Sequence, residues 1–329
     1  MKRIGVLTSG GDAPGMNAAI RAAVRCGTSL GFSLFGIEKG YAGLIAGDVV
    51  PLDNRSVGGI IERGGTILHS ARSQAFRTHD GQQQALATIR EHALDGLIVI
   101  GGNGSLRGAQ WLSEHDVTTI GIPASIDNDV PGSTMAIGVD TALNTVVECL
   151  DRLRDTAIAH ARAFVVEVMG RESGYIALMG GLAGGAEIIL LPELPESLLD
   201  IERKVQRGMS LGKSHSIIVV AEGFRPTDAL SSTSSSAREI CNHLDALGTV
   251  ESRLTILGHL QRGGSPSAFD RVLASRLGEA AIQTFRTQIT SAMMVYDGQN
   301  IVPLPYERLD ERCGNVDSAI LTLADIVAH

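Results

Sequence analysis

The chain has 329 residues, of which 44% are hydrophobic and 19% charged, and these proportions are ordinary for a globular protein with a large core. Its formal net charge of −8 makes nucleic acid and anionic membrane unfavourable partners. The four cysteines (Cys26, Cys149, Cys241 and Cys313) form no CxxC pair, which argues against a zinc site or a disulfide framework and indicates a reducing, cytoplasmic environment. The apolar run after the first three residues is too short for a signal peptide, and no stretch approaches the length of a membrane span.

Apolar runs rich in Val and Ile recur along the chain, and each is followed by a turn. Strands are predicted at residues 4–7, 96–100, 119–123, 164–168 and 217–221, and helices at 16–25, 106–113, 140–155 and 269–285. Runs without polar alternation are typical of strands buried on both faces, and strands that alternate with helices predict parallel α/β sheets. The length suggests two domains. The serine-rich stretch 230–237 is predicted as an exposed, mobile loop.

The turns that follow these strands are the first candidates for a binding site, because α/β sheets bind ligands where their strands end. One turn contains Gly10, Gly11 and Gly15, and another reads Gly-Gly-Asn-Gly-Ser at 101–105. Glycines let backbone N–H groups approach a phosphate, and the helix that follows adds positive potential. A plain turn is an equally good interpretation of the first. A dinucleotide-binding loop is the alternative for the second, although neither turn spells GxGxxG.

Carboxylates also follow predicted strands. Residues 125–129 read Ser-Ile-Asp-Asn-Asp, so Asp127 could accept a proton from an attacking hydroxyl and Asp129 could help to hold Mg²⁺. A solvated Asx turn is the alternative, but the apolar run before this segment favours the functional interpretation. Glu222, after the strand at 217–221, could equally bind sugar hydroxyls or form a salt bridge with an arginine.

Several arginines have settings that suit phosphate recognition. Arg171 follows a buried strand and Gly170, and Arg262 lies with His259 in the glycine-framed segment 258–264. The guanidinium group can bind two phosphate oxygens at once. His259 has no partner His or Cys at ligand spacing, so a hydrogen bond to a sugar or phosphate is a better prediction than metal binding. Further candidates are Arg72, Arg77, Arg162 and Arg253.

Taken together, these segments resemble the phosphofructokinase family. The similarity extends from residue 4 to about residue 278 and includes TSGGDAPGMNAAIR, RGGT, SAR, GGNGS, SIDND, DRLRDT, VEVMGR and LGHLQRGGSP. Related lipid and NAD kinases share a GGDG-type turn but lack this combination. The resemblance implies two Rossmann-like three-layer α/β domains with mainly parallel sheets. Residues 1–138 with 261–311 would form a larger nucleotide-binding domain, and 139–260 with 312–329 a smaller sugar-phosphate-binding domain.

The resemblance also implies a reaction, namely Mg²⁺-dependent phosphoryl transfer from ATP to the 1-hydroxyl of fructose 6-phosphate in glycolysis. Asp127 would be the general base, assisted by Ser125, Gly11, Arg72 and Arg171, and the metal would lie at Asn103 and Asp129. The residues implied to bind the sugar phosphate are Arg162, Met169, Gly170, Glu222, Arg253, His259 and Arg262. Those implied to contact the nucleotide are Gly11, Tyr41, Arg72, Ser73, Arg77, Gly102, Asn103, Gly104, Ser105 and Gly108.

Self-association and regulation are further implications of the resemblance. Arg162 and Arg253 would reach the active site of a neighbouring subunit, typically in a homotetramer. An allosteric effector site would use Arg21, Arg25, Arg154, Glu187 and Lys213. Asn54 and Leu211 stand where the family usually has basic residues, which leaves the effector open.

Three positions bear on the identity of the phosphoryl donor and on metal binding. Gly104 and Ala124 are small where pyrophosphate-using relatives usually carry Asp and Lys, which favours ATP over pyrophosphate as the donor. Asn103 stands where the family usually has a metal-binding Asp, and the amide keeps an oxygen but loses a charge. A pyrophosphate-dependent enzyme and a catalytically weak regulatory paralogue are therefore the two alternatives within the family.

Overall fold

A computed structural model describes residues 2–229, 235–248, 250–287, 290–311 and 317–328. The chain forms two compact units. Unit 1 contains Met1–Thr141 and Arg262–Cys313, and unit 2 contains Ala142–Gln261 and Gly314–His329. The chain leaves unit 1 within helix α5 (Val139–His160) and returns to it at the end of the short helix η2 (Gly258–Arg262). None of the helices in the described residues combines the length and hydrophobicity needed to cross a bilayer.

Unit 1 is built on a seven-stranded sheet with the strand order β11-β10-β5-β4-β1-β2-β3. The five inner strands are parallel, whereas the edge strands β3 and β11 pair antiparallel with β2 and β10. The strands are β1 (Arg3–Ser9), β2 (Ser33–Ile37), β3 (Val49–Leu52), β4 (Gly96–Gly101), β5 (Thr119–Pro123), β10 (Ala292–Tyr296) and β11 (Ile301–Leu304). Both β4 and β5 are buried along their whole length, because helices cover both faces of the sheet.

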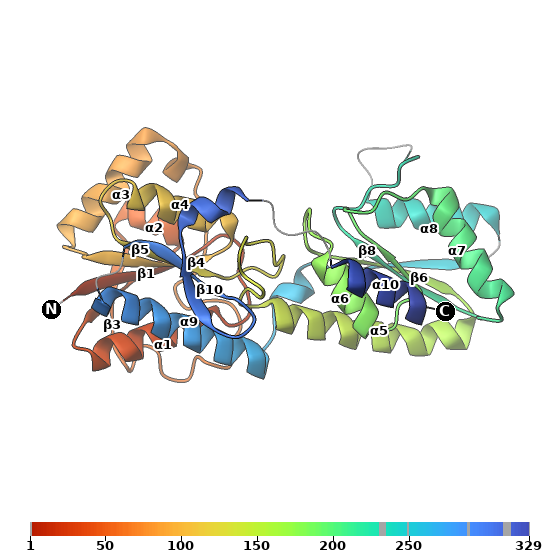
Figure 1. Ribbon diagram of the computed structural model, residues 1–329, viewed down its shortest axis with the longest axis horizontal. Helices are drawn as coiled ribbons and strands as arrows, with labels where there is room; N and C mark the ends of the chain where they lie inside the picture. Colours follow the sequence, from red (N-terminus) through yellow and green to blue (C-terminus); the bar gives the residue numbers. More distant parts are fainter. Residues whose placement is uncertain (1, 230–234, 249, 288–289, 312–316, 329) are drawn as a thin grey trace. The chain divides into compact units, whose positions relative to one another are not determined.

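The helices of unit 1 complete a three-layer sandwich (Figure 1). One layer contains α1 (Met16–Ser29) and α9 (Ala268–Thr287), and the other contains α2 (Gly40–Ala46), α3 (His79–Glu91) and α4 (Asn103–Ser113). The short helices η1 (Ala75–Arg77) and η3 (Tyr306–Asp310) join the second layer. The close approach of α1 and α9 requires Gly278, since a Cβ atom there would lie 2.6 Å from the Ala19 carbonyl oxygen.

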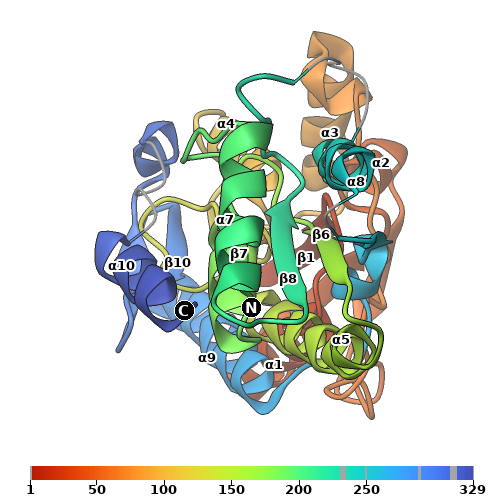
Figure 2. The same ribbon diagram turned by 90° about the vertical axis from the view of Figure 1, so that its right-hand side faces the viewer.

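Unit 2 contains a parallel four-stranded sheet with the order β7-β8-β6-β9. Its strands are β6 (Ala163–Val168), β7 (Ile188–Leu190), β8 (Ser216–Ala221) and β9 (Ser252–Ile256). Helices α5 and α6 (Tyr175–Ala183) cover one face, and α7 (Leu198–Ser210) and α8 (Ser236–Leu247) cover the other (Figures 1 and 2). The C-terminal helix α10 (Ser318–Val327) contacts α6.

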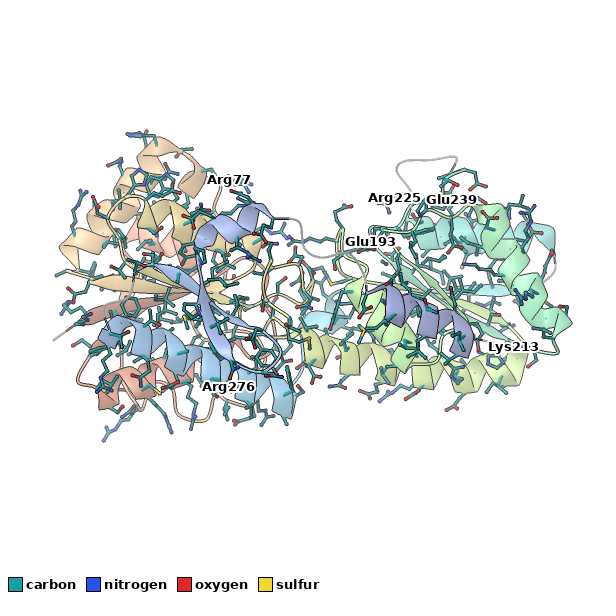
Figure 3. All side chains as sticks on the ribbon, viewed as in Figure 1. Arg77, Glu193, Lys213, Arg225, Glu239 and Arg276 are labelled. Atoms are coloured by element: carbon teal, nitrogen blue, oxygen red, sulfur yellow. The ribbon has the colours of Figure 1, made fainter. Side chains whose placement is uncertain are left out.

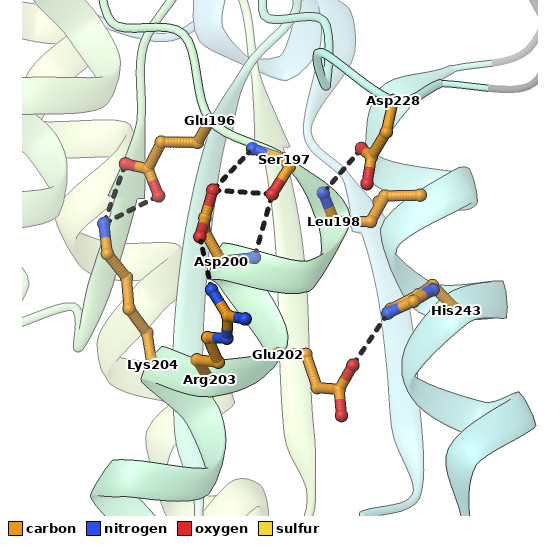
Figure 4. Close-up of polar contacts among 9 residues, drawn as sticks. All are labelled: Glu196, Ser197, Leu198, Asp200, Glu202, Arg203, Lys204, Asp228 and His243. Atoms are coloured by element: carbon orange, nitrogen blue, oxygen red, sulfur yellow. Dashed lines mark hydrogen bonds and ion pairs between the residues drawn. The ribbon is translucent and has the colours of Figure 1, made fainter.

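The start of α7 is fixed by a dense set of polar contacts (Figure 4). Ser197 and Asp200 form a capping box, in which the Ser197 hydroxyl accepts from the Asp200 N–H and the Asp200 carboxylate accepts from the Ser197 N–H. Further along α7, Glu202 lies 3.2 Å from Nε2 of His243 on α8. The two helices are thereby joined by a polar contact in addition to their shared apolar core.

The prediction of mainly parallel α/β sheets is confirmed, and each predicted strand lies within an observed one. The serine-rich stretch gives a different result. Residues 230–234 lie outside the described residues, but Ser236 and Ala237 begin α8 and are buried, so the prediction of an exposed loop is wrong at its end. Burial against the sheet recruits these residues into the helix. The thiols of Cys26, Cys149 and Cys241 are free, and Cys313 lies outside the described residues.

Candidate active site

Three of the predicted turns meet at one edge of the sheet in unit 1. Strands β1, β4 and β5 are neighbours, with Ser9 opposite Gly101 and Gly101 opposite Pro123. The turn after β1, the turn after β4 and the segment 125–129 after β5 therefore lie side by side. Sheet topology brings together glycines and carboxylates that are far apart in the sequence.

The start of α4 has the character of an anion site. Its N-cap is Gly102, which provides no side-chain cap for the first turn. Gly104 is exposed, and a Cβ atom there would meet nothing within 4 Å. Ser105 is buried, and its N–H donates to the Gly102 carbonyl at 2.9 Å. The positive end of the helix dipole and the uncapped N–H groups favour a phosphate at this position.

The segment that carries Arg72 is held against the turn after β1. The Ser70 hydroxyl donates to the Gly10 carbonyl at 2.6 Å. Further back, buried Asn17 donates to the Arg63 carbonyl at 3.0 Å and accepts from the Ile67 N–H at 2.8 Å. Arg72 is exposed beside this anchored segment, which leaves its guanidinium available to a ligand.

Asp127 and Arg262 form the buried centre of the site. Asp127 is only 1% exposed, and its N–H donates to the Ser125 hydroxyl at 3.3 Å. Nη2 of Arg262 lies 3.9 Å from Oδ1 of Asp127, and Nη1 donates to the Asp12 carbonyl at 3.1 Å. A Cβ atom on Gly11 would lie 2.6 Å from Nη1 of Arg262. The guanidinium of Arg262 thus lies between the glycine turn and the candidate base.

Asn103 and Asp129 offer oxygen atoms that suit a hard cation. The Asn103 amide donates through Nδ2 to the Asp129 carbonyl at 2.9 Å, while its Oδ1 is buried without a hydrogen-bond partner among the described residues. No group of three or more His, Cys, Asp or Glu side chains that could hold a metal occurs in the part of the chain that the structure describes. Mg²⁺ in nucleotide sites commonly takes only one or two protein ligands and completes its shell with water and phosphates, so these residues fit it.

Tyr41, a predicted nucleotide contact, lies beneath α4. Its hydroxyl donates to the Ser105 carbonyl at 2.7 Å, and its ring stacks on Phe76 with centroids 4.1 Å apart. Burial raises the pKa of Tyr41 well above its ordinary value, so the phenol remains a donor. Gly108 is needed here, because a Cβ atom would lie 2.6 Å from the Tyr41 ring. Tyr41 therefore supports the first turns of α4, and its contact with a nucleotide stays a prediction.

Ser73 and Arg77 lie near η1. The Ser73 hydroxyl accepts from the Phe76 N–H at 3.2 Å, and Arg77 is exposed at the end of η1 (Figure 3). Both positions stay predicted nucleotide contacts.

In unit 2, the ends of the neighbouring strands β6 and β8 carry a second set of candidates. Glu222 accepts through Oε1 from the N–H groups of Gly170 at 3.3 Å and Arg171 at 2.7 Å. Arg171 adopts a φ of 52°, so this carboxylate stabilises a left-handed turn that residues other than glycine rarely adopt. The sequence indicated a sugar ligand or a salt bridge for Glu222 and gave no sign of this backbone contact.

Gln261 contacts a candidate site residue and was not singled out by the sequence analysis. It is fully buried, and its Oε1 accepts from the Met169 N–H at 3.3 Å. Its neighbour His259 is exposed. The sequence signal that could have indicated Gln261 was its position between His259 and Arg262 in the glycine-framed segment.

Arg162 and Arg253 lie at the opposite edge of the same sheet, where β6 and β9 begin. Glu251 binds both, with Nε of Arg162 2.6 Å from Oε2 and Nη2 of Arg253 at the other oxygen. The guanidinium groups of Arg162 and Arg253 lower the pKa of Glu251. Strand β6 has six residues, so this edge is about 20 Å from the end that carries Met169. The two arginines of one chain therefore cannot join Met169 and Glu222 of that chain around one phosphate.

Three of the five predicted effector residues come together in unit 2. Oε1 of Glu187 lies 3.7 Å from Nη1 of Arg154 and 3.8 Å from Nζ of Lys213, and Lys213 donates to the Ala328 carbonyl at 2.5 Å. Figure 3 labels Lys213. Glu187 and Lys213 line a pocket of about 830 Å³ together with residues of α7 and α10. Arg21 and Arg25 lie on α1 in unit 1.

Glycine turns at strand ends, an uncapped helix start, and a buried carboxylate beside an arginine define a protein of the phosphoryl-transfer class. The family model of phosphofructokinase matches residues 3–285, and the chain belongs to that family. The family and fold predictions are confirmed, and the dinucleotide-binding alternative is wrong.

Two bacterial proteins named ATP-dependent 6-phosphofructokinase illustrate the similarity. The protein of Halalkalibacterium halodurans is 54% identical over 282 residues, which cover 86% of this chain and 85% of the relative. That of Natranaerobius thermophilus is 46% identical over 324 residues, with 98% of each chain covered.

Solved structures show the same fold. Phosphofructokinase from Saccharomyces cerevisiae matches with a TM-score of 0.89 at 35% identity, over all of this chain and 48% of the yeast chain, so this chain spans about half of that one. A pyrophosphate-dependent phosphofructokinase from Nitrosospira multiformis matches with a TM-score of 0.84 at 20% identity, over 96% of this chain and 86% of that chain, which supports the fold alone.

Proposed function

We infer that the protein is an ATP-dependent 6-phosphofructokinase, which transfers the terminal phosphoryl group of ATP to the 1-hydroxyl of fructose 6-phosphate in glycolysis. The single observation that carries the chemistry is buried Asp127, within 3.9 Å of the Arg262 guanidinium and beside the uncapped start of α4. Family membership and relatives that are named for this activity support the substrates.

The positions of the side chains support a role for each in the proposed reaction. Asp127 accepts the proton of the attacking hydroxyl, and Ser125 holds the backbone of the loop that carries it. The turn at Gly11 and the first turn of α4 stabilise the phosphates through backbone N–H groups. Arg262 and the exposed guanidinium of Arg72 compensate negative charge in the transition state. Mg²⁺, which Asn103 and Asp129 would help to hold, supplies charge neutralisation when it is bound with ATP.

The choice of ATP over pyrophosphate rests on two small residues. Ala124 is 1% exposed, so a lysine at this position would place an ammonium group in the interior. Gly104 leaves the surface of α4 open for the rest of a nucleotide. A coupled assay with fructose 6-phosphate and each donor tests the proposal. We expect turnover with ATP and Mg²⁺, and turnover with pyrophosphate alone would contradict it.

Asn103→Asp tests the proposed metal site. The added charge is expected to lower the Mg²⁺ concentration for half-maximal activity about fivefold to tenfold, because about 1–1.4 kcal/mol of extra attraction gives that ratio. The change also removes the donor to the Asp129 carbonyl, now 2.9 Å away, which opposes the gain. Steady-state kinetics over a range of Mg²⁺ measures the result. Asn103→Leu, which removes both groups, is the control and should raise the requirement.

An increased Mg²⁺ requirement in Asn103→Asp would mean that Asn103 serves mainly to anchor the loop at Asp129. Undetectable turnover of the unchanged protein at high Mg²⁺, with fructose 6-phosphate binding intact, would instead favour the catalytically weak alternative.

We also propose that active sites are shared between copies of the chain, as in a homotetramer. Arg162 and Arg253 lie at the sheet edge opposite Met169 and Glu222, so they are positioned to serve the sugar phosphate of another copy. Mixing two inactive variants, Asp127→Ser and Arg162→Ser, is expected to restore activity, because one site of a mixed pair then has both residues intact. If each site is built from one chain, mixed oligomers stay inactive.

The effector site belongs to the same proposal. Arg154, Glu187 and Lys213, with Arg21 and Arg25, would bind a nucleoside diphosphate or phosphoenolpyruvate. The pocket at Glu187 and Lys213 supports this assignment.

A further inference from the structure

Asp270, a residue outside the site described above, is fully buried on α9 in unit 1. Its carboxylate accepts hydrogen bonds from the start of α5. Oδ1 accepts from the Gly138 N–H at 2.9 Å, and Oδ2 accepts from the Thr141 N–H at 2.8 Å and the Thr141 hydroxyl at 2.6 Å. Burial raises the pKa of Asp270, and the hydrogen bonds from Thr141 and Gly138 oppose that rise. The buried carboxylate therefore holds these donors in place.

The two helix starts cap each other. The Thr141 hydroxyl accepts from the Ser267 N–H at 2.9 Å, and the Ser267 hydroxyl accepts from the Asp270 N–H at 3.2 Å and donates to the Asp140 carboxylate at 2.5 Å. In an ordinary capping box, the two side chains serve the backbone of one helix. Here the Thr141 hydroxyl of α5 accepts a hydrogen bond from the start of α9, and the Asp270 carboxylate of α9 accepts hydrogen bonds from the start of α5. A change at either residue therefore loosens both helix starts.

The junction between the starts of α5 and α9 lies at the base, or stem, of the chain segment that carries Ser125 and Asp127. Ala124 and Ile137 form a β-bridge, and the Ile137 N–H donates to the Pro123 carbonyl at 3.1 Å. The residue after Ile137 is Gly138, which Asp270 binds directly. The segment between 124 and 137 is thus closed at its base, one residue before the Asp270 contact.

The same junction contacts the glycine turn of β1. A Cβ atom on Gly138, which has a φ of 99°, would lie 2.7 Å from the Ala13 Cβ. A Cβ atom on Gly15 would lie 2.7 Å from Cγ2 of Ile137 and 3.5 Å from the Cβ of Asp270. The contacts leave no room for even one methyl group, so a displacement of Gly138 is passed on to the turn that carries Gly11.

We propose that Asp270 is a positioning residue for phosphoryl transfer. Through the first turn of α5 it fixes the stem of segment 124–137, and so sets the place of the Asp127 carboxylate relative to Gly11 and Arg262. The expected fall in kcat depends on the proposed function. The expected loosening of segment 124–137 depends only on the hydrogen bonds described above.

Asp270→Asn tests the kinetic consequence. The amide has the shape of the carboxylate but turns an NH₂ group toward the N–H donors of Gly138 or Thr141. We expect kcat to fall about 10²-fold, because a misplacement of about 1 Å has that effect, with KM for fructose 6-phosphate within about twofold. The effect should vanish in the Asp127→Ser background, since Asp270 acts through Asp127.

Ile282→Val is the matched control for lost stability. Ile282 is fully buried on the same helix, away from the junction, and the loss of one buried methylene group lowers stability moderately. It should keep kcat near that of the unchanged protein. An equal loss of kcat in Ile282→Val, or an unchanged kcat in Asp270→Asn, would overturn the proposal.

Hydrogen exchange measured without substrate separates this proposal from the proposed function. Residues 124–141 should exchange faster in Asp270→Asn than in Ile282→Val. Thr141→Val, a milder change that removes one donor and one acceptor, should act in the same direction if Asp270→Asn does not fold. Unchanged exchange in this segment would refute the positioning role whatever the substrate is.

Discussion

Asp127→Ser is expected to lower kcat by about 10²–10⁴-fold, the usual contribution of a general base, and to leave fructose 6-phosphate binding almost unchanged. A serine hydroxyl cannot hold the proton of the attacking hydroxyl at neutral pH. The carboxylate that it replaces is 1% exposed and lies 3.9 Å from the Arg262 guanidinium, so its removal takes away the base from a buried position. Initial rates give kcat, and calorimetric titration with fructose 6-phosphate gives the affinity.

Asp129→Ser is the matched control, because Asp129 lies in the same loop and is only partly buried. Its removal is expected to raise the Mg²⁺ requirement more than it lowers kcat at saturating Mg²⁺. A large loss of kcat in Asp129→Ser with near-normal turnover in Asp127→Ser would mean that Asp129, and not Asp127, is the general base.

Five inner strands and their turns could be predicted from the sequence because their signals are local, whereas the inner strands β2 and β10 were not predicted. Strands β1, β4, β5, β6 and β8 each contain an apolar run without polar alternation, as expected for strands covered on both faces, and each is followed by a recognisable turn. Because the strands were predicted to be parallel, the turns that follow them could be singled out as candidates for a binding site.

The edge strands gave no comparable signal. Strand β3 contains Pro51 and β11 contains Pro303, and both strands are short and partly exposed. Proline is accepted there because an edge strand needs a partner on one side only. A run of four residues that includes a proline does not stand out from a loop in the sequence.

The side-chain contacts could not be predicted either, because they join distant parts of the chain. Arg262 was predicted as a sugar-phosphate ligand, but its contact with Asp127 and its packing over Gly11 depend on how η2 joins unit 1. The backbone contact of Glu222 depends on the parallel pairing of β6 with β8. Nothing local distinguishes Asp270 from an ordinary acidic residue in the first turn of a helix.

Gly11→Ala is expected to lower kcat/KM about 10²-fold with little change in thermal stability. The added Cβ would lie 2.6 Å from Nη1 and 3.1 Å from Cζ of Arg262. The side chain of Arg262 is 9% exposed and donates to the Asp12 carbonyl, so we expect the added methyl group to displace the guanidinium from its place beside Asp127. Gly208→Ala is the control for an added methyl group, because the nearest atom would be Cδ of Lys213 at 3.8 Å. Its activity without effectors should equal that of the unchanged protein.

A double-mutant cycle with Arg262→Ala decides whether the methyl group acts through this arginine. In the Arg262→Ala background the new Cβ meets no guanidinium, so Gly11→Ala should then cost less than about twofold, whereas residues that do not interact give additive effects. Strong non-additivity would show that Gly11 is needed to seat Arg262 beside the base. Additive losses would show that the methyl group acts on the phosphate itself, and that the space at Gly11 is reserved for the transferring group rather than for the arginine.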